Sequence, residues 1–192
     1  MLMVLIKAIG LLVLPALVLW GGILLMSKLS GFESVKRQPA DAATAQELGH
    51  SLQARFSGYK PDEVETHWQA LAGLKGVDGL SAERRLLEID LIFPFLYGGA
   101  LAASLLLAWA ALARPFNPAW AMAPVLITVL ADWTENIVLL NQIKRFGAAG
   151  LQAGWIQAAS LATTVKIFFL IATLLLLLVL VVRMFFQPPQ PS

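Results

Sequence analysis

Four long apolar segments constrain the fold of this chain more than any other feature of its sequence. They are Met3 to Met26, Leu91 to Leu112, Ala119 to Leu140 and Thr164 to Val182. A helix rises about 1.5 Å per residue, so a hydrocarbon core of about 30 Å takes roughly 20 residues to cross. Hydrophobic residues make up 58% of the chain and charged residues only 14%, against about 25% in soluble domains. We therefore predict an integral membrane protein.

The connections predict an all-α fold, an integral membrane four-helix bundle with short amphipathic helices between the first and second crossings. The first connection, residues 27–89, holds both His residues and most of the charges. A capping box at Thr44 to Glu47 precedes one apolar stripe, and Pro61, a favoured first helical residue, precedes a second. We expect both helices on the membrane surface or as a cap on the bundle. The stripes are Ala45, Leu48, Leu52 and Phe56, and then Val64, Trp68 and Leu71.

Local signals divide the remainder of the chain. Ser81 is the expected N-cap of a helix that runs into the second crossing. Pro94 is expected to kink this helix near Leu91 and to free the carbonyl of Asp90. Pro and Asn residues predict a tight turn over 113–118. We divide the chain into a first transmembrane helix (1–26), a polar interfacial segment (27–89), a three-helix unit (90–186) and a disordered tail (187–192).

Two acids, Asp132 and Glu135, lie inside the third apolar crossing and share one helical face with Asn136. Charged groups at that depth are costly, which makes them candidates for function. They lie roughly 12 and 8 Å from the end of the crossing at Leu140. Because successive crossings alternate in direction, this face meets the beginnings of the second and fourth crossings. The ligand-binding candidates are therefore Asp90, Tyr97, Asp132, Glu135, Asn136 and Lys166.

Two interpretations of these six residues stay open. In the first, they form a pocket where the carboxyl groups share a proton, or bind a cation or the polar group of an amphipathic molecule. In the second, Lys166 neutralises one acid, Asn136 bonds between helices, and the group only fixes the register of the bundle. Asp90 and Tyr97 also fit a solvated carboxylate and an interfacial aromatic residue.

Outside the crossings, Arg84 and Arg85 are candidates for binding a phosphate or a lipid headgroup. Arg84 and Glu88, at i and i+4, equally fit an exposed ion pair. A zinc site at His67 would need further ligands, so we interpret His50 and His67 as ordinary surface side chains. The chain has no Cys and no hydrolase motif, and it predicts neither a metal site nor a cofactor. A net charge of +2 does not favour a nucleic-acid partner.

Two short motifs occur in the second and third crossings, Glu88-x-Asp90-x-x-x-Pro94-x-x-Tyr97-Gly98 and Asp132-x-x-Glu135-Asn136. In these motifs the chain resembles a group of bacterial four-helix membrane proteins to which no activity is assigned. The resemblance implies a four-helix fold and carries no function.

The distribution of Lys and Arg predicts an orientation in the bacterial inner membrane. Most of these residues lie on the side of the first connection, whereas Lys7, Arg114 and Arg183 lie on the opposite side. The positive-inside rule then places the mouth near Asp90 in the cytoplasm and both termini outside.

The sequence favours a multi-pass membrane protein with an intramembrane acidic or polar pocket for a cation, a proton or a small amphipathic or lipid ligand, acting in binding or transport. A membrane-embedded acid–base enzyme on a lipid or isoprenoid and an accessory or scaffold subunit stay open. Whether the chain is an enzyme is therefore undecided. The expected partners are membrane lipids, with a homo-oligomer or another membrane subunit as further alternatives.

Overall fold

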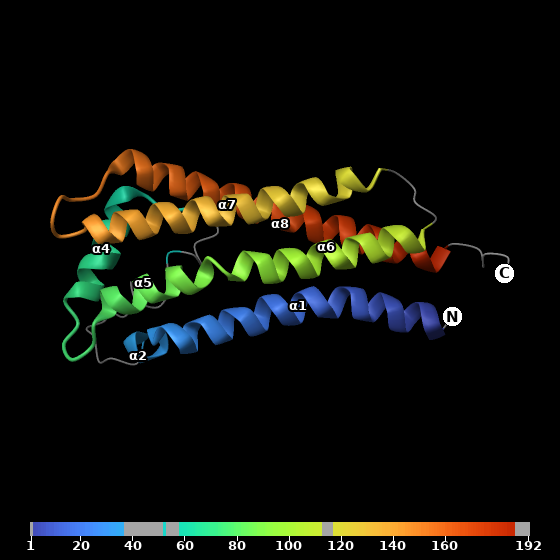
Figure 1. Ribbon diagram of the computed structural model, residues 1–192, viewed down its shortest axis with the longest axis horizontal. Coiled ribbons are helices and arrows are strands. Elements are labelled where there is room, and N and C mark those ends of the chain that lie inside the picture. The colour runs from blue at the N-terminus through green and yellow to red at the C-terminus, as the bar shows by residue number, and fades with distance from the viewer. Residues whose placement is uncertain (1, 37–51, 53–57, 113–116, 187–192) are drawn as a thin grey trace.

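The computed structural model describes residues 2–36, 52, 58–112 and 117–186, and every element of regular secondary structure in these ranges is a helix (Figure 1). The predicted helix after Thr44, His50, most of the turn over 113–118 and the tail lie outside the described residues. The all-α prediction is confirmed. The helices are α1 (Leu2–Ser30), α2 (Phe32–Lys36), α4 (Pro61–Ala72), α5 (Gly79–Asp90), α6 (Phe93–Ala111), α7 (Pro118–Arg145) and α8 (Ala153–Phe186).

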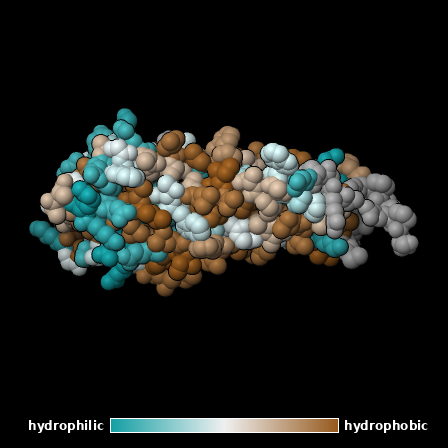
Figure 2. Space-filling model, turned by 45° about the horizontal axis from the view of Figure 1, so that its top comes forward, coloured by the Kyte–Doolittle hydropathy of each residue, from teal (hydrophilic) through white to brown (hydrophobic). Residues whose placement is uncertain are grey.

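Four helical spans are long and apolar enough to cross a membrane: α1, the continuous pair α5 and α6, α7 and α8. Their arrangement as a bundle confirms the predicted fold class. Figure 2 shows hydrophobic side chains over the middle of the molecule and hydrophilic ones at the left, where α4 and the start of α5 lie in Figure 1. We call this the polar end, formed by α4, the start of α5 and the connection from α7 to α8. The start of α1 and the end of α8 lie at the opposite end.

Two helices extend beyond the apolar segments that predicted them. Helix α7 continues past Leu140 to Arg145, and α8 begins at Ala153 rather than at Thr164. Asp132 is therefore roughly 20 Å and Glu135 roughly 15 Å from the end of α7, farther from the helix end than the sequence estimate. The estimate was wrong because it took the last residue of the apolar segment, Leu140, as the end of the helix. The helix continues through the polar residues that follow.

The second crossing is interrupted where the sequence predicts a kink. Helix α5 ends at Asp90, and α6 begins at Phe93 with Pro94 in its first turn, where the missing N–H of proline costs no helical hydrogen bond. The start of α5 differs from the prediction, because its N-cap is Asp78 and not Ser81. The Asp78 carboxylate accepts a hydrogen bond of 3.0 Å from the Ser81 backbone N–H.

Helix α4 caps the bundle at the polar end. It buries Val64, Trp68 and Leu71, the stripe predicted from the sequence, and packs against α5 and α8. The Trp68 ring also meets the ring of Phe146 edge to face, with 5.6 Å between their centroids. Of the two predicted locations for this amphipathic helix, the structure has the cap.

Small residues set how closely the spans approach. A Cβ atom at Gly98 would collide with the side chain of Val129 on α7, and one at Gly22 would collide with the Phe93 ring. Gly99, by contrast, faces open space. Close approach at Gly98 brings α6 against α7 beside Tyr97, one of the candidate site residues.

Candidate functional site

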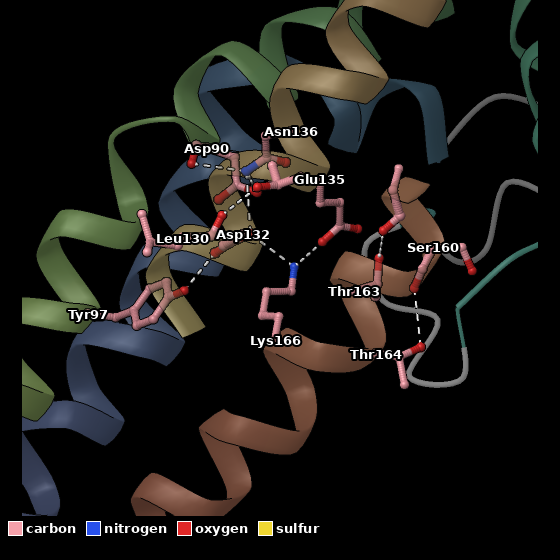
Figure 3. A network of polar contacts seen from close by, with 12 residues as sticks. Asp90, Tyr97, Leu130, Asp132, Glu135, Asn136, Ser160, Thr163, Thr164 and Lys166 are labelled. Carbon is pink, nitrogen blue, oxygen red and sulfur yellow. Dashed lines mark hydrogen bonds and ion pairs between the residues drawn. The ribbon is translucent and has the colours of Figure 1, made fainter. Parts of the chain in front are cut away.

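The six predicted ligand-binding residues meet inside the bundle (Figure 3). They come from α5, α6, α7 and α8, and each of them is linked to another by at least one side-chain hydrogen bond or ion pair. The convergence inferred from alternating crossings is thus confirmed, while a role in binding stays a prediction. We call these residues the intramembrane cluster: Asp90, Tyr97, Asp132, Glu135, Asn136 and Lys166.

Asp132 is the centre of the cluster. Its Oδ2 accepts a hydrogen bond of 2.8 Å from the Tyr97 hydroxyl, and its Oδ1 accepts one of 3.0 Å from the Lys166 ammonium group. The Asn136 amide adds a longer contact of 3.4 Å to Oδ1. Both oxygens of this buried carboxyl group therefore accept hydrogen bonds from described residues.

Lys166 bridges the two acids of α7. Its ammonium nitrogen lies 3.0 Å from Asp132 Oδ1 and 2.5 Å from Glu135 Oε2. Glu135 is fully buried, and its other oxygen, Oε1, has no hydrogen-bond partner among the described residues. The two acids therefore differ: Asp132 has donors on both oxygens, whereas Glu135 has one oxygen open to a further donor or a proton.

The break between α5 and α6 is bonded to α7. The Asn136 amide donates to the freed Asp90 carbonyl at 3.3 Å and to Asp90 Oδ2 at 3.1 Å. One turn away, the indole N–H of Trp133 donates to the Leu91 carbonyl at 2.9 Å. Both carbonyl groups at the break thus have partners, as backbone groups in a membrane require. The sequence analysis identified the freed Asp90 carbonyl and missed Trp133.

Arg84 and Arg85 do not join the cluster. Both are exposed on α5, and Arg84 Nε lies 2.8 Å from Glu88 Oε1 in the ion pair that the i, i+4 spacing predicts. Binding of a phosphate or lipid headgroup by these residues stays a prediction.

The interpretation of His67 as a surface residue is wrong. His67 lies on the buried face of α4 and is fully buried. Its Nε2 lies 3.9 Å from a carboxylate oxygen of Glu83, which is 1% exposed. The spacing of Val64, His67, Trp68 and Leu71 already places this His on the apolar stripe. It is buried because α4 caps the bundle, and the sequence analysis left it off the stripe because it is polar.

Tyr59, which the sequence analysis did not select, is buried between the polar end and the cluster. Its backbone N–H donates to Ser160 Oγ on α8 at 2.9 Å, and Gly58, with φ of 76°, approaches Ser160 so closely that a Cβ atom would collide with it. Burial raises the pKa of the Tyr59 hydroxyl, and the nearby charges of Glu135 and Glu83 raise it further. The phenol is therefore neutral at any physiological pH.

Two grooves follow the seam between α7 and α8. One, of about 550 Å³, opens at the polar end beside Lys144, Arg145 and Trp155. The other, of about 350 Å³, lies farther along the two helices and is lined by residues next in sequence to the cluster, including Ala131 and Val165. Its lining is apolar except for Thr134.

The cluster contains three carboxyl groups, a phenol, an amide and an ammonium group. Within the described residues, no three His, Cys, Asp or Glu side chains are grouped so that they could hold a metal ion. Comparisons with protein-family models, with curated proteins and with solved structures find no match. The chemistry of the site is therefore inferred from its geometry alone.

Proposed function

We propose that this multi-pass membrane protein binds and releases protons at the intramembrane cluster, and that it uses this exchange in transport or in binding. The observation that carries the proposal is the grouping of three carboxyl groups, those of Asp90, Asp132 and Glu135, around the single ammonium group of Lys166. Acids therefore outnumber bases in a buried site.

The excess of acids requires a counter-charge. Inside a membrane protein an uncompensated charge costs several kcal/mol, so buried carboxylates are paired, hydrogen-bonded or protonated. Lys166 compensates one carboxylate, and Asp132 has the fullest set of donors. Glu135 and Asp90, with fewer donors, are the groups best suited to take up a proton. A proton is also the one cation that needs no cavity of its own.

Proton exchange at this site has a route to conformational change. The same bonds that stabilise the carboxylates join α5, α6, α7 and α8. Protonation of Glu135 would remove the charge that pairs with Lys166 and weaken the contact between α7 and α8. A protonation step therefore changes the balance of interhelical bonds, which is the requirement for coupling an ion to a second event.

The test measures proton uptake by purified protein in lipid nanodiscs as the pH is changed, with the carboxyl infrared band as a second signal. The double variant Asp132→Asn/Glu135→Gln should lose the part of the band that responds to pH in the buried environment. Glu65→Gln, which removes an exposed acid on α4, is the matched control and should keep that part.

Other occupants give different results. If the buried part of the band ignores pH and shifts on addition of sodium ions or of a long-chain amine, the site takes a cation or an amphipathic ligand and the proton proposal is wrong. An identical pH response in the wild type and in the double variant also contradicts it.

The titratable groups that face the site are Asp90, Tyr97, Asp132, Glu135, Lys166, Tyr59 and Glu83.

A further inference from the structure

Several buried polar atoms of the cluster, of Tyr59 and of α4 and α5 lack hydrogen-bond partners within the described residues. They are Glu135 Oε1, Tyr59 Oη, both carboxylate oxygens of Glu83 and Trp68 Nε1. A buried polar group without a partner costs about 1–3 kcal/mol, and native proteins usually satisfy such groups, often with internal water. Several of them in one region indicate a polar passage rather than isolated packing defects.

The positions of these atoms define a direction. Ser160, Thr163 and Lys166 follow one another at a spacing of three on α8, and Figure 3 shows them beside Glu135. The backbone N–H of Tyr59 is bonded to Ser160, which lies roughly 9 Å along the helix from Lys166 towards the polar end. Tyr59 therefore follows the cluster in the direction of the polar end.

Glu83 and His67 continue the series. Glu83 lies in the first half of α5 and His67 in α4, the helix that caps the bundle, and their charged atoms are 3.9 Å apart. The charges of Glu135 and Glu83 both raise the pKa of the Tyr59 hydroxyl, so this hydroxyl is within electrostatic range of the two acids. Histidine is the side chain that ordinarily exchanges protons near neutral pH.

We propose that His67, Glu83 and Tyr59 form a buried route along which protons pass between the polar end and the intramembrane cluster. We call these three residues the cap route. The inference rests on the proposed function, because it supplies the cluster with protons, and it adds the side from which they enter. His67 and Glu83 lie 3.9 Å apart, beyond hydrogen-bond distance, so a bridging water molecule completes that step.

Each member of the cap route has a defined part in the transfer. His67 accepts a proton at the polar end and passes it to the Glu83 carboxylate. Tyr59 accepts a proton on its hydroxyl oxygen as it releases its own towards Glu135, so the phenol is unchanged after each passage. Reversal of these steps returns a proton to the polar end. No other reactant is consumed.

The experiment follows the rate of protonation at the cluster after a rapid pH jump, in full-length protein in lipid nanodiscs. The signal is the part of the carboxyl infrared band that the double variant Asp132→Asn/Glu135→Gln lacks. Tyr59→Phe should slow this signal by about tenfold or more, because it removes the hydroxyl group through which the proton passes. Its final amplitude should equal that of the wild type, because the cluster itself is intact.

A second variant and a control separate the route from packing. Glu83→Gln keeps the size of the side chain and should slow the signal to a similar degree. Leu71→Val alters the packing of the same cap, keeps every polar and titratable group and should leave the rate unchanged. Equal slowing in Leu71→Val and Tyr59→Phe would assign the effect to packing and overturn the route.

The two proposals fail in different ways. Unchanged rates in Tyr59→Phe and Glu83→Gln, with a normal final amplitude, overturn the cap route and leave proton binding at the cluster intact. Absence of any cluster signal in the wild type overturns the proposed function and the route together.

Discussion

The intramembrane cluster and the cap route are both buried and both acidic, yet they differ in how their polar atoms are satisfied. In the cluster, Asp132 has donors on both oxygens, and they come from helices α6, α7 and α8. In the cap, Glu83 is equally buried, but neither of its oxygens accepts a hydrogen bond from a described residue.

This difference shows that burial alone does not define the role of an acid in a membrane protein. A buried carboxylate whose oxygens all accept hydrogen bonds stabilises the arrangement of helices around it. A buried carboxylate without hydrogen-bond partners destabilises the fold and is retained for another reason. The two regions should therefore respond in opposite directions when their polar groups are removed.

The largest expected effect follows from removing the single cation of the cluster. Lys166→Met leaves the Asp132 and Glu135 carboxyl groups without their counter-charge, and the free energy of unfolding should fall by about 3–5 kcal/mol. Unfolding in mixed detergent micelles, followed by circular dichroism, measures this loss. Lys144→Met, at an exposed position on α7, should stay within about 0.5 kcal/mol of the wild type. A similar loss in both variants would contradict the central place of Lys166.

The two buried tyrosines provide a direct comparison of the regions. Tyr97→Phe removes a hydrogen bond to a charged group and should lower the free energy of unfolding by about 1.5–3 kcal/mol. Tyr59→Phe removes a hydroxyl group without a described partner, so its effect should stay within about 0.5 kcal/mol. The same unfolding measurement serves for both variants. Equal losses in the free energy of unfolding would contradict the difference between tyrosines with and without a hydrogen-bond partner.

Replacement of the cap acid should stabilise the protein. Glu83→Met keeps the approximate size of the side chain and removes a buried carboxyl group that accepts no hydrogen bond from a described residue, so the free energy of unfolding should rise by about 1 kcal/mol. Thermal unfolding in detergent measures this gain. The matched change Glu135→Met, in the cluster, should instead lower stability because it breaks the ion pair with Lys166. Destabilisation by Glu83→Met would mean that this acid has bonds like those of the cluster.

The smallest effect is expected at Asp78, an exposed acid that contrasts with both buried regions. Hydrogen bonds from Ser81 hold the pKa of Asp78 below its ordinary value, so the ionised carboxylate stabilises the start of α5. Since the folded-state pKa is lowered, this contribution is present above the ordinary pKa and is lost as the pH falls below about 4. Asp78→Ala should lower the melting temperature slightly at neutral pH and lose this difference from the wild type in acid. A difference that persists in acid would show that ionisation of Asp78 is irrelevant.

The spans and the membership of the cluster could be predicted because they depend on simple properties. Apolar length identifies the crossings, and alternating direction brings Asp90, Asp132 and Lys166 to one level without any knowledge of packing. The break near Leu91 follows from the covalent geometry of Pro94. These are local or topological consequences of the sequence.

The remaining features depend on tertiary contacts. The location of Tyr59 follows from its bond to Ser160, a residue far along the chain, and the bond from Trp133 to Leu91 requires two helices to face each other at the right height. The burial of His67 had a signal in its spacing, which its polarity obscured. The N-cap at Asp78 was missed because Asp78 and Ser81, three residues apart, are both residue types that favour the N-cap position.

The interruption at Leu91 and Ile92 divides the second crossing into two rods, and its consequence is mechanical. Its carbonyl groups are fastened to Trp133 and Asn136, so α5 cannot swing relative to α6 without detaching from α7 as well. Asp90, the last residue of α5, and Leu91, in the break, are therefore both bonded to α7. A displacement of α7 would act first on this junction, and would reach α4 only through the length of α5.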